Sequence, residues 1–181
     1  MTGKEFKHIL LDERETLFDL YETGKISTNE FLTKIIERAD LEPTEELFSK
    51  FDKAIRVFSN PDRRMLNLIK SLNSNVTLAI LSNNWMALEE TIRGLDGTKY
   101  EYLSLFGEHV YLSHRIGYKK PDKEAFQVVL DHIGIEPQNV LFVDDKERNT
   151  LIAEEMGMKG YIYTKEKFKE FEEYIFEYVS V

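Results

Sequence analysis

The feature that most restricts the fold is a short apolar run that ends in two adjacent carboxylates. Residues 140–143, Val-Leu-Phe-Val, form the run, and Asp144 and Asp145 follow it directly. An unbroken apolar run rich in Val and Phe is typical of a strand buried on both faces. Open parallel α/β sheets place their ligand sites at the carboxyl ends of such strands. The run therefore predicts a parallel sheet with the acid pair at its functional edge.

The acid pair itself allows two interpretations. Neighbouring carboxylates repel each other, so a cation is expected beside Asp144 and Asp145, and Mg²⁺ is the simplest oxygen-seeking candidate. Alternatively, the two residues are a solvated pair that caps the following helix, because Asp is a favoured N-cap residue. The pair taken alone does not decide between a metal site and a helix cap.

Composition excludes several classes of partner. The 181 residues suffice for one domain with a small additional subdomain. With 24 Lys and Arg against 33 Asp and Glu, the net charge of -9 disfavours nucleic acid and anionic membranes as main partners. The chain has no Cys, which excludes disulfides and thiolate metal sites. Because neither a signal-peptide core nor a membrane-spanning apolar run is found, a cytoplasmic location is expected.

Residues 1–60 carry helical patterns and predict a small helical, cap-like subdomain. Ser27 and Glu30 have capping-box spacing ahead of an apolar stripe, and a further helix is expected from Thr44 onward.

Residues 61–181 change to an alternation of strands and helices. Asn60 is the expected N-cap at this boundary, with Pro61 at the first helical position. Strands that alternate with helices imply right-handed crossovers and a three-layer, Rossmann-like parallel α/β sheet. The strands are expected at residues 76–81, 110–112, 140–143 and 161–163.

Residues 1–21 allow two interpretations. One is an amphipathic helix, because Thr2 and Glu5 have capping-box spacing and the later apolar residues fall near one helical face. The other is a short strand over residues 6–11 that ends in Asp12. The periodicity favours the helix slightly, and the strand remains the alternative.

Polar residues also follow strand 76–81 and precede a later helix. Ser82 and Asn83 come directly after the strand, where a hydroxyl and backbone N–H groups can hold a phosphate oxygen. Lys120 precedes Pro121 at the start of a helix and can bring a cation to the acid pair. The structural alternatives are an ordinary helix cap for Ser82 and a solvated surface residue for Lys120.

The order and spacing of these residues resemble the haloacid dehalogenase-like (HAD) superfamily of hydrolases and phosphatases. LAILSNN is similar to its motif II, YLSHRIGYKKPDKEAFQVVL to motif III and VLFVDDKERN to motif IV. YETGKISTNEFL resembles the start of the helical cap found in sugar-phosphate phosphatases of this type. The resemblance implies a Rossmann-like sheet with a helical cap and a Mg²⁺-dependent phosphatase of a small phosphorylated metabolite.

The resemblance also implies a role for each candidate residue. Ser82, Asn83 and Lys120 would bind the phosphoryl group, and Lys120 would take part in catalysis. Asp144 and Asp145 would hold Mg²⁺.

Motif I departs from the pattern of the superfamily. The superfamily has an apolar strand followed by Asp-x-Asp-x-Thr, in which the first Asp becomes phosphorylated and the second acts as acid and base. The sequence ILLDERETL supplies Asp12 and Thr16 at the outer positions, but Arg14 stands in place of the second Asp. Arg cannot act as a base because it stays protonated. The chain is therefore expected to be either a slow phosphatase with Asp12 as nucleophile or a non-catalytic relative that serves as a binding or assembly module.

Two further expectations concern the sheet and the carboxyl end of the chain. If residues 6–12 are not a strand, strand 76–81 would have to pair directly with strand 140–143, or another segment would have to lie between these two strands in the sheet. The aromatic-rich end, KFKEFEEYIFEYVSV, is expected to form a helix packed on the sheet and is the candidate contact of a homodimer.

Overall fold

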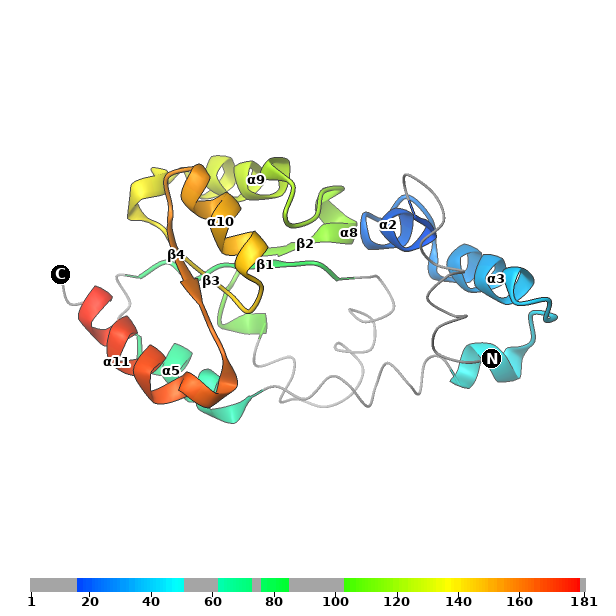
Figure 1. Ribbon diagram of the computed structural model, residues 1–181, viewed down its shortest axis with the longest axis horizontal. Coiled ribbons are helices and arrows are strands. Elements are labelled where there is room, and N and C mark those ends of the chain that lie inside the picture. The colour runs from blue at the N-terminus through cyan, green and yellow to red at the C-terminus, as the bar shows by residue number, and fades with distance from the viewer. Residues whose placement is uncertain (1–15, 51–61, 73–75, 85–102, 180–181) are drawn as a thin grey trace. The chain divides into compact units, whose positions relative to one another are not determined.

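The computed structural model describes residues 16–50, 62–72, 76–84 and 103–179, which Figure 1 draws as coloured ribbons. They form two compact units. The first unit contains residues 16–50, 82–84 and 112–119, and the second contains residues 62–72, 76–81, 103–111 and 120–179. The predicted division into a cap-like region, 1–60, and a core, 61–181, stays a prediction. None of the helices in the described ranges is long and apolar enough to cross a bilayer.

The first helix of the first unit begins later than the helical interpretation of residues 1–21 requires. Thr16 has an extended backbone with φ -66° and ψ 154°, and its side chain accepts a hydrogen bond from the backbone N–H of Asp19. The Asp19 carboxylate accepts a hydrogen bond from the Thr16 backbone N–H at 2.9 Å, which completes a capping box. One continuous helix through Thr16 is therefore wrong, while residues 6–12 lie outside the described residues. The helix that Thr16 caps is α2 (Leu17–Glu22).

The predicted capping box at Ser27 and Glu30 is confirmed, and it starts α3 (Thr28–Arg38). Tyr21, at the end of α2, stacks on Phe31 of α3 with ring centroids 4.2 Å apart. The Tyr21 hydroxyl lies 2.9 Å from Thr28 Oγ1, so its polar end is also satisfied. This contact forms the centre of the apolar core of the first unit.

The second unit contains the strand–helix–strand element that the sequence predicts around residues 140–143. Strand β3 (Leu141–Asp144) pairs in parallel with β4 (Lys159–Ile162), and α10 (Glu147–Glu155) connects them (Figure 1). The register places Asp144 opposite Ile162. The chain then leaves α10 through Gly157, whose φ of +90° suits glycine.

Different helices cover the two faces of β3. Phe142 meets Phe126 of α9 (Lys123–Ile133), with ring centroids 5.0 Å apart. Leu141 and Val143 point the other way, into a cluster built by α5 (Arg63–Ser71) and α11 (Phe168–Val179). Helix, sheet and helix layers confirm the predicted three-layer α/β arrangement. The buried residues of that cluster are Leu68, Phe168, Phe171 and Ile175.

Two expectations about segment ends are wrong. The N-cap of α5 is Asp62, whose carboxylate accepts from the backbone N–H of Arg64, so Asn60 is not the cap and Pro61 is not the first helical residue. The apolar run 76–81 forms regular strand only at its end, as β1 (Ile80–Ser82).

Strand β1 pairs with β2 (Val110–Leu112), which confirms the predicted strand 110–112. Among the described residues, β3 pairs only with β4 and β1 only with β2. The direct pairing considered between 76–81 and 140–143 is therefore not found. The remaining short elements are α8 (Ser113–Ile116), η1 (Pro137–Asn139) and η2 (Lys165–Lys167).

Gly24 is a position at which only glycine fits, because there is no room for a Cβ atom. Its φ is +71°, and a Cβ there would overlap the main-chain oxygen of His114. Gly117 also has a left-handed backbone, φ +79°, but no described atom lies within 4 Å of its Cβ position.

Both Gly→Ala variants incur a backbone strain of about 1–2 kcal/mol, and only Gly24→Ala adds a clash. Urea unfolding followed by circular dichroism should show the larger loss for Gly24→Ala; equal losses would contradict this account.

Candidate active site

Asp144, the last residue of β3, is held from three directions. Its Oδ2 accepts a hydrogen bond from Lys120 Nζ at 2.6 Å. Its Oδ1 accepts from the backbone N–H of Lys146 and from Asn149 Nδ2, each at 2.9 Å. Asp144 is 8% exposed, so these donors replace the water that a carboxylate would otherwise bind.

These contacts determine the charge of Asp144. Burial raises the pKa of the Asp144 carboxyl, but the hydrogen bond and charge of Lys120, with smaller contributions from Lys146 and Asn149, outweigh burial and lower the pKa below its ordinary value. Asp144 is therefore an anion at neutral pH. The Lys146 backbone N–H also donates to Asp144 just before α10, but the N-cap of that helix is Lys146 and Asp144 is buried, so Asp144 is not a solvated helix cap. Its role as a metal ligand stays a prediction.

Of two adjacent lysines, only Lys120 serves this site. Its ammonium group lies 5.5 Å from the centroid of the Phe142 ring as well as on Asp144, which fixes it over the end of β3. Lys119 instead forms ion pairs in the first unit with Asp19 and, at 3.3 Å, with Glu22 of α2. Burial lowers the pKa of Lys119, but these carboxylates outweigh it and raise that pKa.

Asn149 is a site residue that the sequence interpretation missed. It is 3% exposed, donates to Asp144, and leaves its own Oδ1 buried without a hydrogen-bond partner among the described residues. The signal was present, because Asn149 is a polar residue in the first turns of the helix that directly follows the acid pair.

The oxygen atoms at this edge fit a hard cation. Asp144, the exposed Asp145 carboxylate and the partnerless Asn149 Oδ1 are the ligand types that Mg²⁺ prefers. The described residues contain no group of three or more His, Cys, Asp or Glu side chains suited to a metal. Such a set still suits Mg²⁺, which usually takes one or two carboxylates and completes its shell with water and substrate phosphate.

Ser82 and Asn83 lie at the end of β1, in the first unit, on a loop held by α8. Ser113 Oγ accepts from the Asn84 backbone N–H at 2.8 Å and donates to the Asn84 carbonyl at 3.0 Å. The ring Nδ1 of His114 lies 2.8 Å from the same carbonyl. These contacts position the backbone directly after Ser82 and Asn83.

The predicted site residues thus fall into three groups. The structure brings Lys120 onto Asp144, with Asp145 as the next residue, in the second unit. Ser82 belongs to the first unit, and Asp12 lies outside the described residues.

The layers and the lysine–carboxylate pair at the end of a parallel strand define a Rossmann-like α/β protein with a charged site at its sheet edge. The chain belongs to the haloacid dehalogenase-like hydrolase family, whose family model matches residues 6–162. The resemblance inferred from the motifs is therefore confirmed.

Several relatives of the chain are named as phosphatases. The D-ribitol-5-phosphate phosphatase of Bacteroides thetaiotaomicron is 27% identical over 146 residues, which is 80% of this chain and 70% of that protein. A phosphorylated carbohydrates phosphatase of Thermotoga maritima is 28% identical over 142 residues, 74% of this chain and 62% of that protein.

Solved structures share the fold. A HAD family enzyme from Bacteroides thetaiotaomicron, in complex with magnesium and inorganic phosphate, is 24% identical with a TM-score of 0.73 over 89% of this chain and 84% of that chain. A protein described as a predicted HAD-like family hydrolase, from Porphyromonas gingivalis, is 24% identical with a TM-score of 0.77 over 95% of this chain and 87% of that chain. These similarities confirm the predicted fold class.

The lowered pKa of Asp144 predicts how the stability of the second unit depends on pH. A carboxylate whose pKa is lower in the folded than in the unfolded protein stabilises the fold above the unfolded value, 3.8, and this contribution is lost as pH falls through the folded pKa. Asp144→Asn should therefore lower the free energy of unfolding by about 2 kcal/mol near neutral pH, and the difference from wild type should shrink as pH falls below 4.

Urea unfolding at a series of pH values measures this difference. Asp145→Asn is the matched control, because Asp145 is exposed and its substitution should cost less at neutral pH. A constant difference between Asp144→Asn and wild type across the pH series would contradict the prediction.

Proposed function

We propose that this chain is a Mg²⁺-dependent phosphatase that hydrolyses a small phosphorylated metabolite through an aspartyl-phosphate. The observation that carries the proposal is the 2.6 Å contact of Lys120 with Asp144 at the carboxyl end of β3, beside the partnerless oxygen of Asn149. Family membership and the phosphatase relatives support the same reaction class. The net charge of -9 leaves local cations such as Lys120 to bind an anionic substrate.

In the proposed site, some residues would bind the metal ion and Lys120 would bind the phosphoryl group. Asp144, Asp145 and Asn149 would hold Mg²⁺, which when bound neutralises phosphoryl oxygens and polarises the phosphorus. Lys120 would bind a phosphoryl oxygen while it keeps Asp144 ionised. Phosphoryl transfer depends mainly on such positioning and charge neutralisation.

The loop at the end of β1 that carries Ser82 and Asn83 would complete the substrate contacts. Ser82 would donate its hydroxyl to a phosphoryl oxygen, and Asn83 would add a backbone or side-chain donor. The bonds of Ser113 and His114 to Asn84 would keep this loop in one conformation.

Asp12 would be the nucleophile. Its carboxylate oxygen would attack phosphorus as the bond to the substrate alkoxide breaks. The alkoxide would take a proton from water, and the resulting hydroxide would attack the phosphorus of the aspartyl-phosphate, releasing phosphate and restoring Asp12. Arg14 stays protonated at neutral pH and so acts neither as the acid nor as the base of these steps, and turnover should be slow.

Phosphate release from an aryl phosphate and a panel of sugar phosphates, with Mg²⁺ and with chelator, tests this function. Release should require Mg²⁺, and Lys120→Met should lower kcat/KM by about 100-fold or more, because a charge aimed at the transition state is lost. Asp12→Asn and Asp145→Asn should also lose activity.

Lys119→Met is the matched control for Lys120→Met, since it removes the same charge from the neighbouring residue without touching Asp144. It should stay near wild type in kcat/KM while losing stability in α2. Absence of metal-dependent release above the Asp12→Asn background would contradict the proposal for those substrates. That outcome would favour the non-catalytic binding module, to be checked by calorimetry with Mg²⁺ and inorganic phosphate.

A further inference from the structure

Three side chains of the second unit form a cluster that the proposed function does not use. The hydroxyl oxygen of Tyr111 lies 2.9 Å from Nδ1 of His132 and 3.4 Å from Nδ1 of His109. Two imidazole nitrogens therefore converge on one phenol oxygen. A phenol carries a single proton, so it can donate to only one of the two rings.

The distances within this His–Tyr–His cluster suit a metal ion with square-planar ligands. With metal–ligand bonds of about 2.0 Å, neighbouring donor atoms in such a set lie roughly 2.8 Å apart, and two imidazoles on opposite sides of the metal have ring centroids roughly 6.4 Å apart. The centroids of His109 and His132 are 6.3 Å apart. The Tyr111 oxygen, near both rings, would take the position between them.

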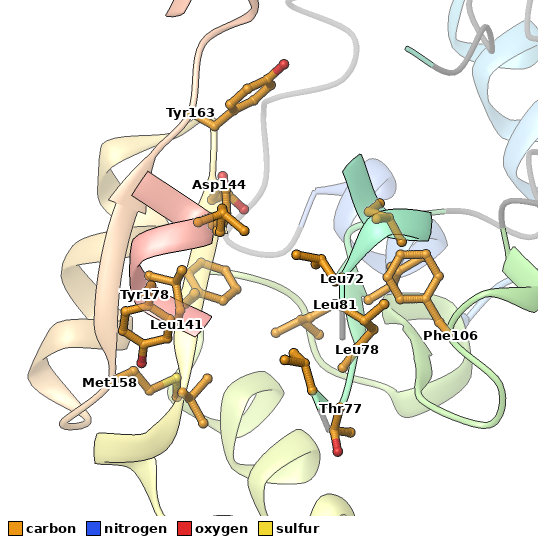
Figure 2. Close-up of a pocket in the computed structure, with 18 of the residues that line it drawn as sticks. Leu72, Thr77, Leu78, Leu81, Phe106, Leu141, Asp144, Met158, Tyr163 and Tyr178 are labelled. Carbon is orange, nitrogen blue, oxygen red and sulfur yellow. The ribbon is translucent and has the colours of Figure 1, made fainter. Parts of the chain in front are cut away.

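Packing and backbone hydrogen bonds hold the cluster in place. Phe106, ahead of β2, and Phe126 and Leu130 of α9 are buried and line one apolar groove of the second unit, in which Figure 2 shows Phe106. The backbone N–H of His109 donates to the Phe106 carbonyl, and the His109 carbonyl accepts from Ile80 N–H, each at 2.9 Å. The donors therefore stand on positioned backbone, as a metal site requires.

The charges around the cluster favour a cation. His132 lies in the last turn of α9, an 11-residue helix whose C-terminal end carries a partial negative charge. Burial and, to a smaller extent, the charge of Glu108 raise the pKa of the Tyr111 hydroxyl, so the phenol is neutral at neutral pH. Since His132 is exposed, water can reach the site as a fourth ligand.

We propose that His109, Tyr111 and His132 bind a divalent transition metal ion of the square-planar type, such as Cu²⁺ or Ni²⁺. Imidazole nitrogen is a preferred ligand of both ions, and square-planar sets of nitrogen and oxygen donors are typical of them. The third donor is a phenol, which distinguishes this cluster from the groups of His, Cys and carboxylates that the described residues lack.

Binding replaces the hydrogen bonds of the cluster with metal–ligand bonds. Each His uses its neutral Nδ1 as donor and keeps its ring proton on Nε2. The phenol O–H bond breaks, its proton passes to solvent, and the phenolate oxygen binds the ion. The bound ion would then join the start of β2 to the end of α9.

This site does not depend on the proposed phosphatase reaction. Its ligands are nitrogen atoms and a phenol, whereas the oxygen ligands of Asp144, Asp145 and Asn149 suit Mg²⁺. Metal titrations carried out in excess Mg²⁺ therefore measure the His–Tyr–His cluster separately from the candidate active site.

A Cu²⁺ titration of the full chain in excess Mg²⁺, followed by visible absorption and calorimetry, tests the proposal. One Cu²⁺ should bind with a phenolate-to-copper charge-transfer band. Tyr111→Phe, which keeps the volume of the buried ring, should abolish the band. His109→Gln and His132→Gln should each weaken binding by more than about tenfold, because loss of a ligand costs more than loss of a supporting contact.

His114→Gln is the matched control, because His114 lies in the first unit against the Asn84 carbonyl. It should keep both the band and the affinity of wild type. Copper binding without the band, or with equal affinity in wild type, His109→Gln and His132→Gln, would mean an adventitious surface ion only and would overturn the proposal.

Thermal unfolding with Ni²⁺ gives a second readout, since an ion that binds only the folded chain stabilises it. At a Ni²⁺ concentration about 100 times the Kd, the Tm of wild type should rise by about 5 °C, and that of His132→Gln should stay unchanged. The exposed position of His132 makes loss of folding an unsuitable explanation for this difference. Equal shifts in the two proteins would place the ion elsewhere and contradict the assignment.

Discussion

The contact between Lys120 and Asp144 is the interaction around which the second unit is organised. Asp144 is a buried carboxylate opposite Ile162 in the ladder, at the end of a strand whose Leu141 and Val143 pack on an apolar cluster, so its charge needs a partner at that point. Lys120 supplies the partner, and the first residues of α10 supply the remaining donors. Removing either charge would leave the other buried, which is why the strand end, the helix start and the segment before α9 are fixed together.

Much of this arrangement follows from local sequence. The run at 140–143 predicts a strand, and β3 (Leu141–Asp144) is found there with partly buried apolar side chains; Gly157 follows the next helix with the positive φ that suits glycine. The capping box at Ser27 could be predicted from the sequence because both of its hydrogen bonds are made within one helical turn. Lys120, Asp144 and Asp145 were predicted as a group because parallel strands bring their carboxyl ends to one edge.

Other features could not be predicted, because the local sequence is compatible with more than one structure. Asp62 and Asn60 are both good caps, and the Asp62 carboxylate also pairs with the Arg64 guanidinium, which stabilises the later start. Thr16 interrupts a periodicity that looked helical, because its own capping bonds with Asp19 outweigh continuation of the turn. Asn149 was overlooked because its role depends on a contact back to Asp144 rather than on its neighbours in the chain. Ser82, Asn83 and Asp12 stay predictions as site residues.

Within the described parts of the chain, β1 and β3 each have one edge without a strand partner, and this matters before folding is complete. A strand edge flanked by leucines does not discriminate strongly among partners, so until it is covered it can also pair with another molecule. Molecules that each carry a net charge of -9 repel one another, which lowers the rate of such encounters. The net negative charge thus lowers the tendency to aggregate. High salt screens this repulsion and should therefore increase aggregation.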